Sequence, residues 1–457
     1  MGRAGTNHVG NAGPDHLAAP EPADFEPQPW EEVGRVPHVR PFRAVRYDPE
    51  RAGPLEAVLA PPYDVIDPDL QDRLYRRSPQ NIVRLVLGRT FPGDGPTNNQ
   101  YTRAAALYRR WRQAGILRLE AEPALYLYAQ RYQVGDGERL TWGWVVAAQV
   151  EALGAGRFLP HEATLPGPKA DRLALWSETR AIFSQVFGLY HAPDEAERAL
   201  AFRLMAGEPL ERSVDDDGVE HQVWVLPAGP DQARLIAALA PQTVVLADGH
   251  HRFETALALA QGPLGRLPGA GRVPMWLVNT ALAPVTVLPT HRVLLAAEGL
   301  PSWDELLRLA QDAFQVERLP GSPEPQGGGA GEPADAQTVH LLGPDGTAWR
   351  LRPRAQASGD LAVVALHREL LDPILQRAGG SQAAGAERWL RFTHQAGEAR
   401  RWLAEGRGVA AFLLPALEGE AVRQAAVTVG RLPQKSTYFY PKAPSGLLIY
   451  DLEESLG

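Results

Sequence analysis

The chain has 457 residues, of which 44% are hydrophobic and 22% charged, and its formal net charge is -8. This length predicts two or three domains with sizeable cores, and the acidic balance argues against a nucleic-acid partner held by a basic face. The absence of cysteine excludes disulfides, thiolate metal sites and cysteine nucleophiles, and it fits a reducing cytoplasm. The first residues show no signal region and no apolar run is long enough for a membrane span, so we expect a cytoplasmic protein.

The N-terminal part begins with a stretch rich in Pro, Gly, Ala and Glu, which predicts a disordered tail at 1–34. An N-terminal α/β region is expected at 35–149. Its predicted elements are a strand at 58–66 ending in a Pro-Pro turn, a helix capped by Asp67 or Asp69 and ending at Arg77, a strand at 81–87, a helix at 101–114, and a hairpin of strands at 124–132 and 140–148.

A core region is expected at 150–300 and a C-terminal α/β region at 301–457, with a Gly- and Pro-rich flexible insertion at 320–337. The core region predicts helices at 195–204 and 231–240 and strands at 222–226, 273–279 and 286–294. The C-terminal region predicts helices at 303–314, 361–375 and 418–429 and strands at 339–342, 349–351 and 408–414. Strands, helices and a hairpin are mixed, so we predict an α+β fold with mixed sheets and flanking helices.

The most informative stretch is 243–257. Its apolar run from Val244 to Ala247 predicts a short buried strand, Asp248-Gly249 a tight turn, and 250–261 a helix. A strand that turns through glycine into a helix forms an anion-binding corner, because the first-turn N–H groups are unpaired and the helix dipole favours negative charge. The glycine spacing matches neither a Walker loop nor a dinucleotide fingerprint.

This corner carries a cluster of ionisable groups that suits phosphoryl transfer to a hydroxyl. Asp248 would accept the hydroxyl proton, His250 and His251 with the helix N-terminus would hold phosphate oxygens, and Arg252 would stabilise the transferring charge. Taken singly, each residue is explained as well by a helix cap or a solvated face. The clustering favours a site.

His161-Glu162 forms a second cluster. A zinc-protease helix would need a second histidine at 165, where the chain has Leu165, so that interpretation fails. A hard cation such as Mg²⁺ needs only one or two carboxylates beside phosphate oxygens, and Asp248 or Glu162 could supply them. A plain surface acid is an equal alternative for Glu162.

Lysine occurs at only three positions, 169, 435 and 442. Lys169, Asp171 and Arg172 are expected to lie in a Pro-Gly-Pro loop before a helix. These residues either form a surface ion pair or present two cations to a phosphoryl group. Lys435 and Lys442 border a segment with two hydroxyls and three aromatics, which is either an exposed strand or a binding loop for an anionic ligand.

Five segments together resemble one widespread bacterial family, catalogued as domain of unknown function ten-fifteen, in order from about Val36 to Tyr450. They are Ala-Pro-Pro-Tyr-Asp-Val-Ile at 60–66, Pro-His-Glu-x-Thr at 160–164 with Lys169, Asp171 and Arg172, Ala-Asp-Gly-His-His-Arg-Phe-Glu-Thr-Ala-Leu at 247–257, Leu-Pro-Thr-His-Arg at 288–292, and Lys-Ser-Thr-Tyr-Phe-Tyr-Pro-Lys at 435–442. Candidate substrate or phosphate ligands within them are His161, Lys169, Asp171, Arg172, His291, Arg292, Lys435, Ser436 and Lys442.

The family is more distantly similar to the ParB/sulfiredoxin-like superfamily, whose free serine kinases of the SerK and SbnI type phosphorylate L-serine through an Asp-Gly-His-x-Arg motif. The resemblance implies that Asp248 is the base, that Glu162 is a second essential acid, and that Gly249, His250, His251 and Arg252 hold the phosphate donor. The implied cofactors are Mg²⁺ and ATP, ADP or pyrophosphate. Relatives often read Ser-Pro-Ile-Phe where this chain has 184–187 without the proline, so no site role is carried to that segment.

Two alternatives from other classes stay open. One is a non-catalytic nucleotide- or metabolite-binding protein, and the other is a ParB-like nucleotide-dependent DNA-partition protein, against which the acidic charge argues. Sulfiredoxin chemistry is excluded because it needs cysteine. We therefore expect a small-molecule kinase with a substrate such as L-serine and a nucleotide or pyrophosphate as partners, without nucleic acid or membrane, and with homo-oligomerisation left open.

Overall fold

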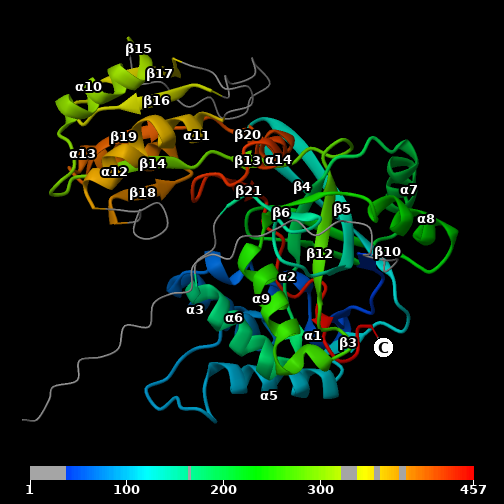
Figure 1. The fold of residues 1–457 in the computed structure, drawn as a ribbon. Coiled ribbons are helices and arrows are strands. Elements are labelled where there is room, and N and C mark those ends of the chain that lie inside the picture. Colours follow the sequence, from blue (N-terminus) through cyan, green and yellow to red (C-terminus); the bar gives the residue numbers. More distant parts are fainter. Residues whose placement is uncertain (1–37, 163–165, 321–336, 355–360, 380–387, 457) are drawn as a thin grey trace, which may run out of the picture. The chain divides into compact units, whose positions relative to one another are not determined.

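The structure is a computed structural model that describes residues 38–162, 166–320, 337–354, 361–379 and 388–456. The chain divides into two units, Met1–Val36 and Pro37–Gly457, and all described residues belong to the second. The expected tail at 1–34 and nearly all of the insertion at 320–337 lie outside the described residues. Helices alternate with mixed sheets along the unit, which confirms the α+β fold (Figure 1).

The largest sheet has nine strands in the order β6-β11-β8-β12-β5-β4-β10-β9, with β1 paired to β5. Its strands are β1 (Val39–Arg40), β4 (Leu125–Val134), β5 (Gly137–Gln149), β6 (Phe158–Pro160), β8 (Val186–Tyr190), β9 (Glu211–Val214), β10 (Glu220–Leu226), β11 (Val244–Asp248) and β12 (Arg272–Asn279). The β11–β6 and β12–β8 pairs are parallel and the others are antiparallel. The predicted hairpin is confirmed as β4–β5, and the sheet joins strands from both sides of residue 150.

Close packing at this sheet depends on small residues. A Cβ added to Gly143 in β5 would lie 2.2 Å from the carbonyl oxygen of Leu277 in β12, and one added to Gly188 in β8 would lie 2.6 Å from Val244 in β11. Such distances are below any real van der Waals contact. Gly143 therefore lets the backbone of β12 approach closely, and Gly188 leaves room for the side chain of Val244.

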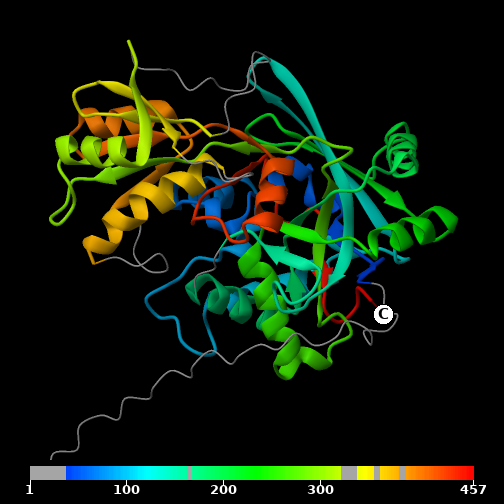
Figure 2. The ribbon, with the colours of Figure 1, turned by 45° about the horizontal axis from the view of Figure 1, so that its top comes forward.

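Helices α5 (Gln100–Gln113), α6 (Pro166–Thr179) and α9 (His250–Gln261) lie side by side (Figures 1 and 2). The predicted helix at 101–114 is confirmed as α5, which begins with a capping box between Asn99 and Thr102 and buries Tyr108 and Trp111. The expected loop after residue 166 is wrong, because α6 already begins at Pro166. Proline is well tolerated in the first turn of a helix, where its missing N–H has no partner anyway.

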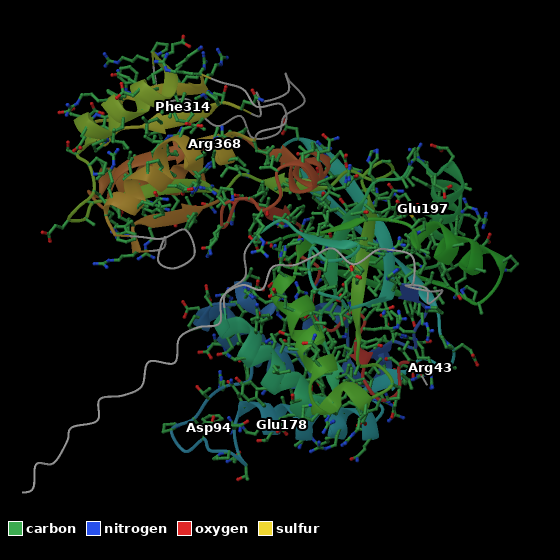
Figure 3. The ribbon with its side chains drawn as sticks, in the orientation of Figure 1. Arg43, Asp94, Glu178, Glu197, Phe314 and Arg368 are labelled. Atoms are coloured by element: carbon green, nitrogen blue, oxygen red, sulfur yellow. The ribbon has the colours of Figure 1, made fainter. Side chains whose placement is uncertain are left out.

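Helices α7 (Glu195–Met205), α8 (Pro230–Leu239) and α14 (Gly419–Thr428) also contact the large sheet or its connections, and all three were predicted. The α7 contact contains a buried carboxylate, that of Glu197, labelled in Figure 3. It accepts hydrogen bonds from Trp144 Nε1 at 3.0 Å, Tyr190 Oη at 2.5 Å and Asn279 Nδ2 at 3.0 Å. Three strands are thereby tied to one helix, and the buried acid is fully satisfied.

Short elements precede the hairpin: β2 (Val45–Tyr47), α1 (Pro49–Ala52), α2 (Leu55–Val58), the 3₁₀ turn η2 (Tyr63–Val65), α3 (Pro68–Arg77), α4 (Val83–Val86) and β3 (Leu117–Leu119). The helix capped by Asp67 is confirmed, whereas the strands expected at 58–66 and 81–87 are wrong. Asn81 caps the N–H of Val83 at 3.0 Å and so starts a helical turn within the apolar run. Ala60 forms only an isolated bridge with Ser445.

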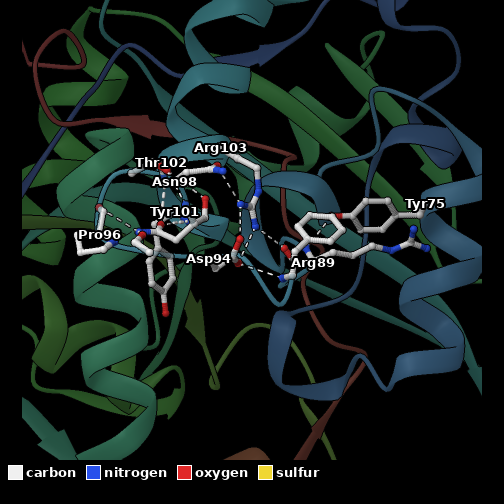
Figure 4. Close-up of polar contacts among 11 residues, drawn as sticks. Tyr75, Arg89, Asp94, Pro96, Asn98, Tyr101, Thr102 and Arg103 are labelled. Atoms are coloured by element: carbon white, nitrogen blue, oxygen red, sulfur yellow. Dashed lines mark hydrogen bonds and ion pairs between the residues drawn. The ribbon is translucent and has the colours of Figure 1, made fainter.

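The entry to α5 is fixed by a polar network, shown in Figure 4. Arg103 makes hydrogen bonds to both carboxylate oxygens of Asp94, at 2.6 and 2.9 Å, and donates to the carbonyl of Arg89 at 2.8 Å. The guanidinium of Arg89 lies 4.3 Å from the ring centroid of Tyr75 in α3. The exposed segment from Arg89 to Asp94 is therefore held by α5 through Arg103 and by α3 through Tyr75.

A second sheet has six strands in the order β15-β17-β16-β19-β14-β18. They are β14 (His291–Leu295), β15 (Phe314–Arg318), β16 (Val339–Leu342), β17 (Ala348–Pro353), β18 (Leu390–Thr393) and β19 (Gly408–Leu413), with helices α10 (Trp303–Ala313), α11 (Ala362–Leu366), α12 (Asp372–Arg377) and α13 (Ala396–Ala404). The helix predicted at 361–375 is found as α11 and α12 joined by a π-turn, η4 (His367–Leu371).

Among the described residues, three small sheets join segments that are distant in sequence, and one of them pairs β2 with β3. Of the other two, one pairs β13 (Thr286–Leu288) with β20 (Leu417–Glu418) and β21 (Tyr438–Tyr440), and the other pairs β7 (Ala181–Ile182) with β22 (Tyr450–Asp451). A 3₁₀ turn, η3 (Pro263–Arg266), follows α9. Across the described ranges, no helix combines the length and apolarity needed to traverse a bilayer.

Candidate active site

The predicted strand, turn and helix at 243–261 are confirmed as β11, Gly249 and α9. Gly249 adopts φ 87° and ψ 29°, a left-handed conformation that favours glycine. A Cβ at this position would also lie 2.9 Å from Nε of Arg252. Because the residue at the N-cap is glycine, it offers no side chain to cap the helix, and the first-turn N–H groups suit an anion.

Asp248 ends the strand and holds two cations. Its Oδ2 accepts a hydrogen bond from Arg252 Nη2 at 2.8 Å, and its Oδ1 accepts one from Lys442 Nζ at 3.3 Å. Burial alone would raise the pKa of Asp248, but the charges of Lys442 and Arg252 outweigh it and lower this pKa to about 2. The carboxylate is therefore ionised at neutral pH and fixes two cations at the helix N-terminus.

Arg252 is buried and is held on a second side by the backbone. Its Nη1 donates to the carbonyl oxygen of Gln185, in the segment between β7 and β8. The side chain of Gln185 in turn donates to the carbonyl of Leu448 at 2.6 Å. The sequence did not indicate this role for 184–187, because a backbone carbonyl is common to all residues and leaves no residue-type signal.

The histidines beside Asp248 form a buried pair. His250 Nε2 accepts from the backbone N–H of His161 at 3.3 Å, and the two rings meet edge to face at 4.7 Å. His161 Nδ1 contacts the carbonyl of Leu246 at 2.5 Å and its Nε2 contacts Thr437 Oγ1 at 2.7 Å. Burial, with the neighbouring His161, places the pKa of His250 well below its usual value. His250 is thus a neutral group that orients its neighbours.

His251 and Glu162 occupy the rim of this pair. His251 is half-buried, burial lowers its pKa, and its Nδ1 has no hydrogen-bond partner among the described residues. Glu162 Oε1 lies 3.7 Å from His250 Nδ1, and 32% of the Glu162 side chain is exposed. Burial and the nearby charge of Asp248 raise the pKa of Glu162, although His161 opposes them. Two carboxyls with opposite pKa shifts therefore share one site.

The C-terminal segment 435–442 completes the cluster, because β21 pairs with β13 and brings Lys442 to Asp248. Lys442 Nζ also lies 4.6 Å from the ring centroid of Tyr438, and that ring lies 3.8 Å from the ring centroid of His394. Lys435 lies close enough for its charge to lower the pKa of Glu162. The sequence missed His394, a lone histidine outside any motif.

Lys169, Asp171 and Arg172 lie on α6, in the first half of the helix. Lys169 Nζ forms an ion pair with Glu254 Oε2 at 2.5 Å, which links α6 to α9. Asp171 accepts from Tyr101 Oη at 2.8 Å and from Arg172 Nε at 2.7 Å. Arg172 is buried, donates to the carbonyl of Val86 at 2.8 Å and covers the ring of Tyr63 at 3.8 Å. These contacts join α6 to neighbouring helices and turns. Of the three residues, Lys169 is the one whose charge lowers the pKa of His251.

Arg292 and Ser436 hold the backbone near the start of the segment 435–442, whereas His291 contacts Leu414. His291 Nδ1 accepts from the N–H of Leu414 at 3.1 Å. Arg292 is fully buried, donates to His367 Nε2 at 3.0 Å and reaches the carbonyl of Lys435 at 3.3 Å. Ser436 Oγ donates to the carbonyl of Pro433 at 2.5 Å. The polar groups of these three residues are thus bound to other parts of the protein. The predicted site residues that the structure does bring together are Asp248, Gly249, His250, His251, Arg252, His161, Glu162 and Lys442.

The carboxylates and imidazoles of this site limit the metal ions that it could hold. In the part of the chain that the structure describes, no group of three or more His, Asp or Glu side chains is arranged to hold a metal ion. Asp248 already has a cation on each oxygen, whereas Glu162 is partly exposed. These donors fit Mg²⁺ only as an ion that takes one or two carboxylates and completes its shell with phosphate oxygens and water.

The family model described as protein of unknown function (DUF1015) matches residues 39–374, which is more than half of the chain. No curated protein matches the sequence significantly. Among solved structures, a free serine kinase in complex with AMP aligns over 65% of this chain and 88% of its own, at 14% identity and a TM-score of 0.34. SbnI with a C-terminal truncation, from Staphylococcus aureus, aligns over 68% and 87%, at 12% identity and a TM-score of 0.31.

Proposed function

This chain belongs to the family described as protein of unknown function (DUF1015), and we propose that it is a phosphotransferase acting on a small hydroxylated molecule. The family that the motifs predicted is thereby confirmed. One observation carries the proposal: Asp248 holds Arg252 and Lys442 at the N-terminus of α9, with the carboxyl of Glu162 beside them. Cations fixed at a helix N-terminus bind phosphate oxygens, and a nearby carboxyl can take a hydroxyl proton.

We assign the proton acceptor to Glu162, although the motif resemblance implied Asp248. A general base works best when its pKa lies near the working pH, and the pKa of Asp248 is about 2 while that of Glu162 is raised. In this scheme Glu162 removes the hydroxyl proton of the acceptor. The electron pair left on the acceptor oxygen attacks the terminal phosphorus of the donor. The bond from that phosphorus to the bridging oxygen breaks, and the rest of the donor leaves with that oxygen.

The remaining groups stabilise charge and position. Lys442 and the first-turn N–H groups of α9 neutralise the phosphoryl oxygens. Asp248 keeps Lys442 in place and is itself held by the buried Arg252. His250 stays neutral and orients the backbone of His161, next to Glu162. A bound Mg²⁺ would supply charge neutralisation on the donor phosphates. A remaining lone pair of Asp248, the ionised carboxylate at the helix N-terminus, would hold it together with phosphate oxygens and water, which leaves Glu162 free to act as the base.

L-Serine is the acceptor that the motif resemblance favours, with ATP, ADP or pyrophosphate as donor. The test incubates the purified chain with L-serine, Mg²⁺ and each donor in turn, and measures O-phosphoserine by mass spectrometry. We expect product with one donor, and loss of product with Lys442→Gln. The matched control is Arg401→Gln, which removes a charge from an exposed position on α13. Donor binding without product from any small alcohol would contradict the proposal.

A further inference from the structure

A concave site lies at the six-stranded sheet, beside β18. Its volume is about 560 Å³, and its lining includes Leu295, Arg391, Phe392, Trp402, Arg407 and Lys435. This volume is within the range of roughly 300–1,000 Å³ typical of small-molecule sites. Except for Leu295, these residues follow position 374, where the family-model match ends, and Lys435 also belongs to the motif segment 435–442. The site is therefore a feature of this chain's C-terminal part.

The lining combines cations with flat apolar rings. Within the described residues, Arg391 forms no ion pair with a carboxylate, and Arg407 pairs only with Glu405, on an exposed surface. Phe392 and Trp402 are half-buried and supply the apolar part. Three cationic side chains at one concavity are unusual in a chain of net charge -8, and they suit phosphate groups. The two rings suit a flat heterocycle.

Lys435 is held toward this site by buried structure. It adopts φ 53°, a left-handed conformation that is unfavourable for a residue other than glycine. The fully buried Arg292 reaches the carbonyls of Gln434 at 3.4 Å and Lys435 at 3.3 Å and so keeps the backbone in that conformation. Lys435 Nζ then lies 5.8 Å from the ring centroid of Phe392. Strain maintained by a buried arginine is typical of functional positions.

The ring of Phe392 is fixed as well. Phe392 lies opposite Arg292 in the pairing of β18 with β14, and the Arg292 guanidinium lies 5.6 Å from its ring centroid. Among the described strands, β18 is at the edge of the sheet, so the concavity opens beside a strand that has one neighbour. The aromatic surface is thus held in place before any ligand arrives.

We propose that this concavity binds a nucleoside phosphate. The heterocyclic base packs on Phe392 and Trp402, and Arg391, Arg407 and Lys435 hold the phosphates. The proposal does not depend on phosphoryl transfer at Asp248. The segment from Lys435 to Lys442 joins the two sites, since its Thr437 contacts His161 and its Lys442 contacts Asp248.

The test is calorimetric titration of the full-length chain with ADP, without any acceptor. It starts from the Lys442→Gln variant, so that binding at the α9 corner is weakened. In that background we expect the double substitution Arg391→Gln with Arg407→Gln to weaken ADP binding at least tenfold. Arg401→Gln also removes an exposed positive charge, but Arg401 does not line the concavity, so this variant should bind ADP with unchanged affinity.

Two comparisons complete the experiment. Adenosine and inorganic phosphate, titrated separately, should each bind at least tenfold more weakly than ADP, because each engages only half of the lining. Equal ADP affinity in the double variant and in Arg401→Gln would overturn the proposal, as would undetectable ADP binding. Phosphate binding as tight as ADP binding would also overturn it, because the aromatic part would then have no role. Product formation from L-serine is measured separately and tests only the α9 corner.

Discussion

At the scale of single residues, the site depends on two carboxyls with opposite electrostatic surroundings. Asp248 has a cation on each oxygen, whereas Glu162 is partly buried and lies near the charge of Asp248. In the proposed mechanism, Asp248 positions the cations while Glu162 takes the proton. Residue identity alone did not distinguish the two, because the pKa of a carboxyl depends on groups that the fold brings to it.

Glu162→Gln should lower kcat by about 10²- to 10⁴-fold, the usual contribution of a general base, with little change in the affinity for the phosphate donor. In the unsubstituted protein, kcat/KM should fall at acid pH through a pKa above 4.5, because burial raises the pKa of Glu162. Steady-state kinetics from pH 4 to 8 measure both. An acid limb that persists in Glu162→Gln would contradict the assignment.

Asp248→Asn should lower kcat as well, for a different reason. It removes the anion that positions Lys442 and leaves the buried Arg252 without its carboxylate, so we expect a loss of stability of about 1–3 kcal/mol beside the loss of activity. Urea unfolding of the two variants separates the roles, since Glu162→Gln should unfold near the wild-type midpoint. Equal stability of Asp248→Asn and wild type would show that the ion pairs contribute little.

His291 gives a pH-dependent contribution to stability. Burial, with His394 and Arg292 nearby, lowers its pKa to about 4. The unfolded chain binds the proton more readily below about pH 6.5, so stability is complete above that value and is lost as pH falls toward 4. Between pH 7.5 and pH 5 the protonation of His291 in the unfolded chain should lower the free energy of unfolding by about 2 kcal/mol. Urea unfolding of His291→Asn should show a correspondingly smaller loss over this range, and an unchanged loss would exclude His291 as the cause.

At the scale of elements, the turn between β11 and α9 is the decisive connection. The hydrophobic run, the glycine and the helical period identified it in the sequence, and the structure has the same strand, turn and helix. The neighbouring predictions at 58–66 and 81–87 failed because short apolar runs suit a buried helical turn as well as a strand. There, Asn81 decided in favour of helix through a side-chain cap.

Gly249→Ala tests this turn. The substitution forces a Cβ into a left-handed conformation and against the Arg252 guanidinium, so we expect a loss of about 1–2 kcal/mol in stability and a large loss of activity. Gly218→Ala is the matched control, because Gly218 has φ 78° but no atom within 4 Å of the added Cβ. The control should lose a similar amount of stability from the strained backbone and retain its activity. Loss of activity in both variants would show that the turn is not specific.

At the scale of the whole molecule, the C-terminal segment is part of the core. Leu448, Ile449 and Tyr450 are fully buried, β22 pairs with β7, and Tyr108 Oη donates to Asp451 at 2.9 Å. The same segment begins just after Lys442. Folding of the chain end therefore positions a cation of the proposed active site.

Removal of residues 446–457 should prevent stable folding. It deletes five buried apolar side chains, Leu447, Leu448, Ile449, Tyr450 and Leu452, and each contributes about 1.5–3 kcal/mol, which together approaches the whole stability of a typical protein. Circular dichroism and urea unfolding measure the effect. Glu453→Ala, an exposed change at the same end of the chain, should leave the midpoint within about 0.5 kcal/mol of wild type. A truncated chain that unfolds cooperatively near the wild-type midpoint would contradict this view.

The sequence by itself determined the α+β class, the β4–β5 hairpin and the strand-turn-helix that carries Asp248 and the two histidines. These follow from local periodicity, glycine and capping signals, which act within a few residues. Only the tertiary structure decided that Lys442 binds Asp248 and that the carbonyl of Gln185 accepts a hydrogen bond from Arg252. It also decided that Arg292 binds the backbone of Lys435 and that His291 binds the backbone of Leu414. Such contacts join residues tens to hundreds of positions apart, and burial and pairing there set each group's charge, which no local pattern encodes.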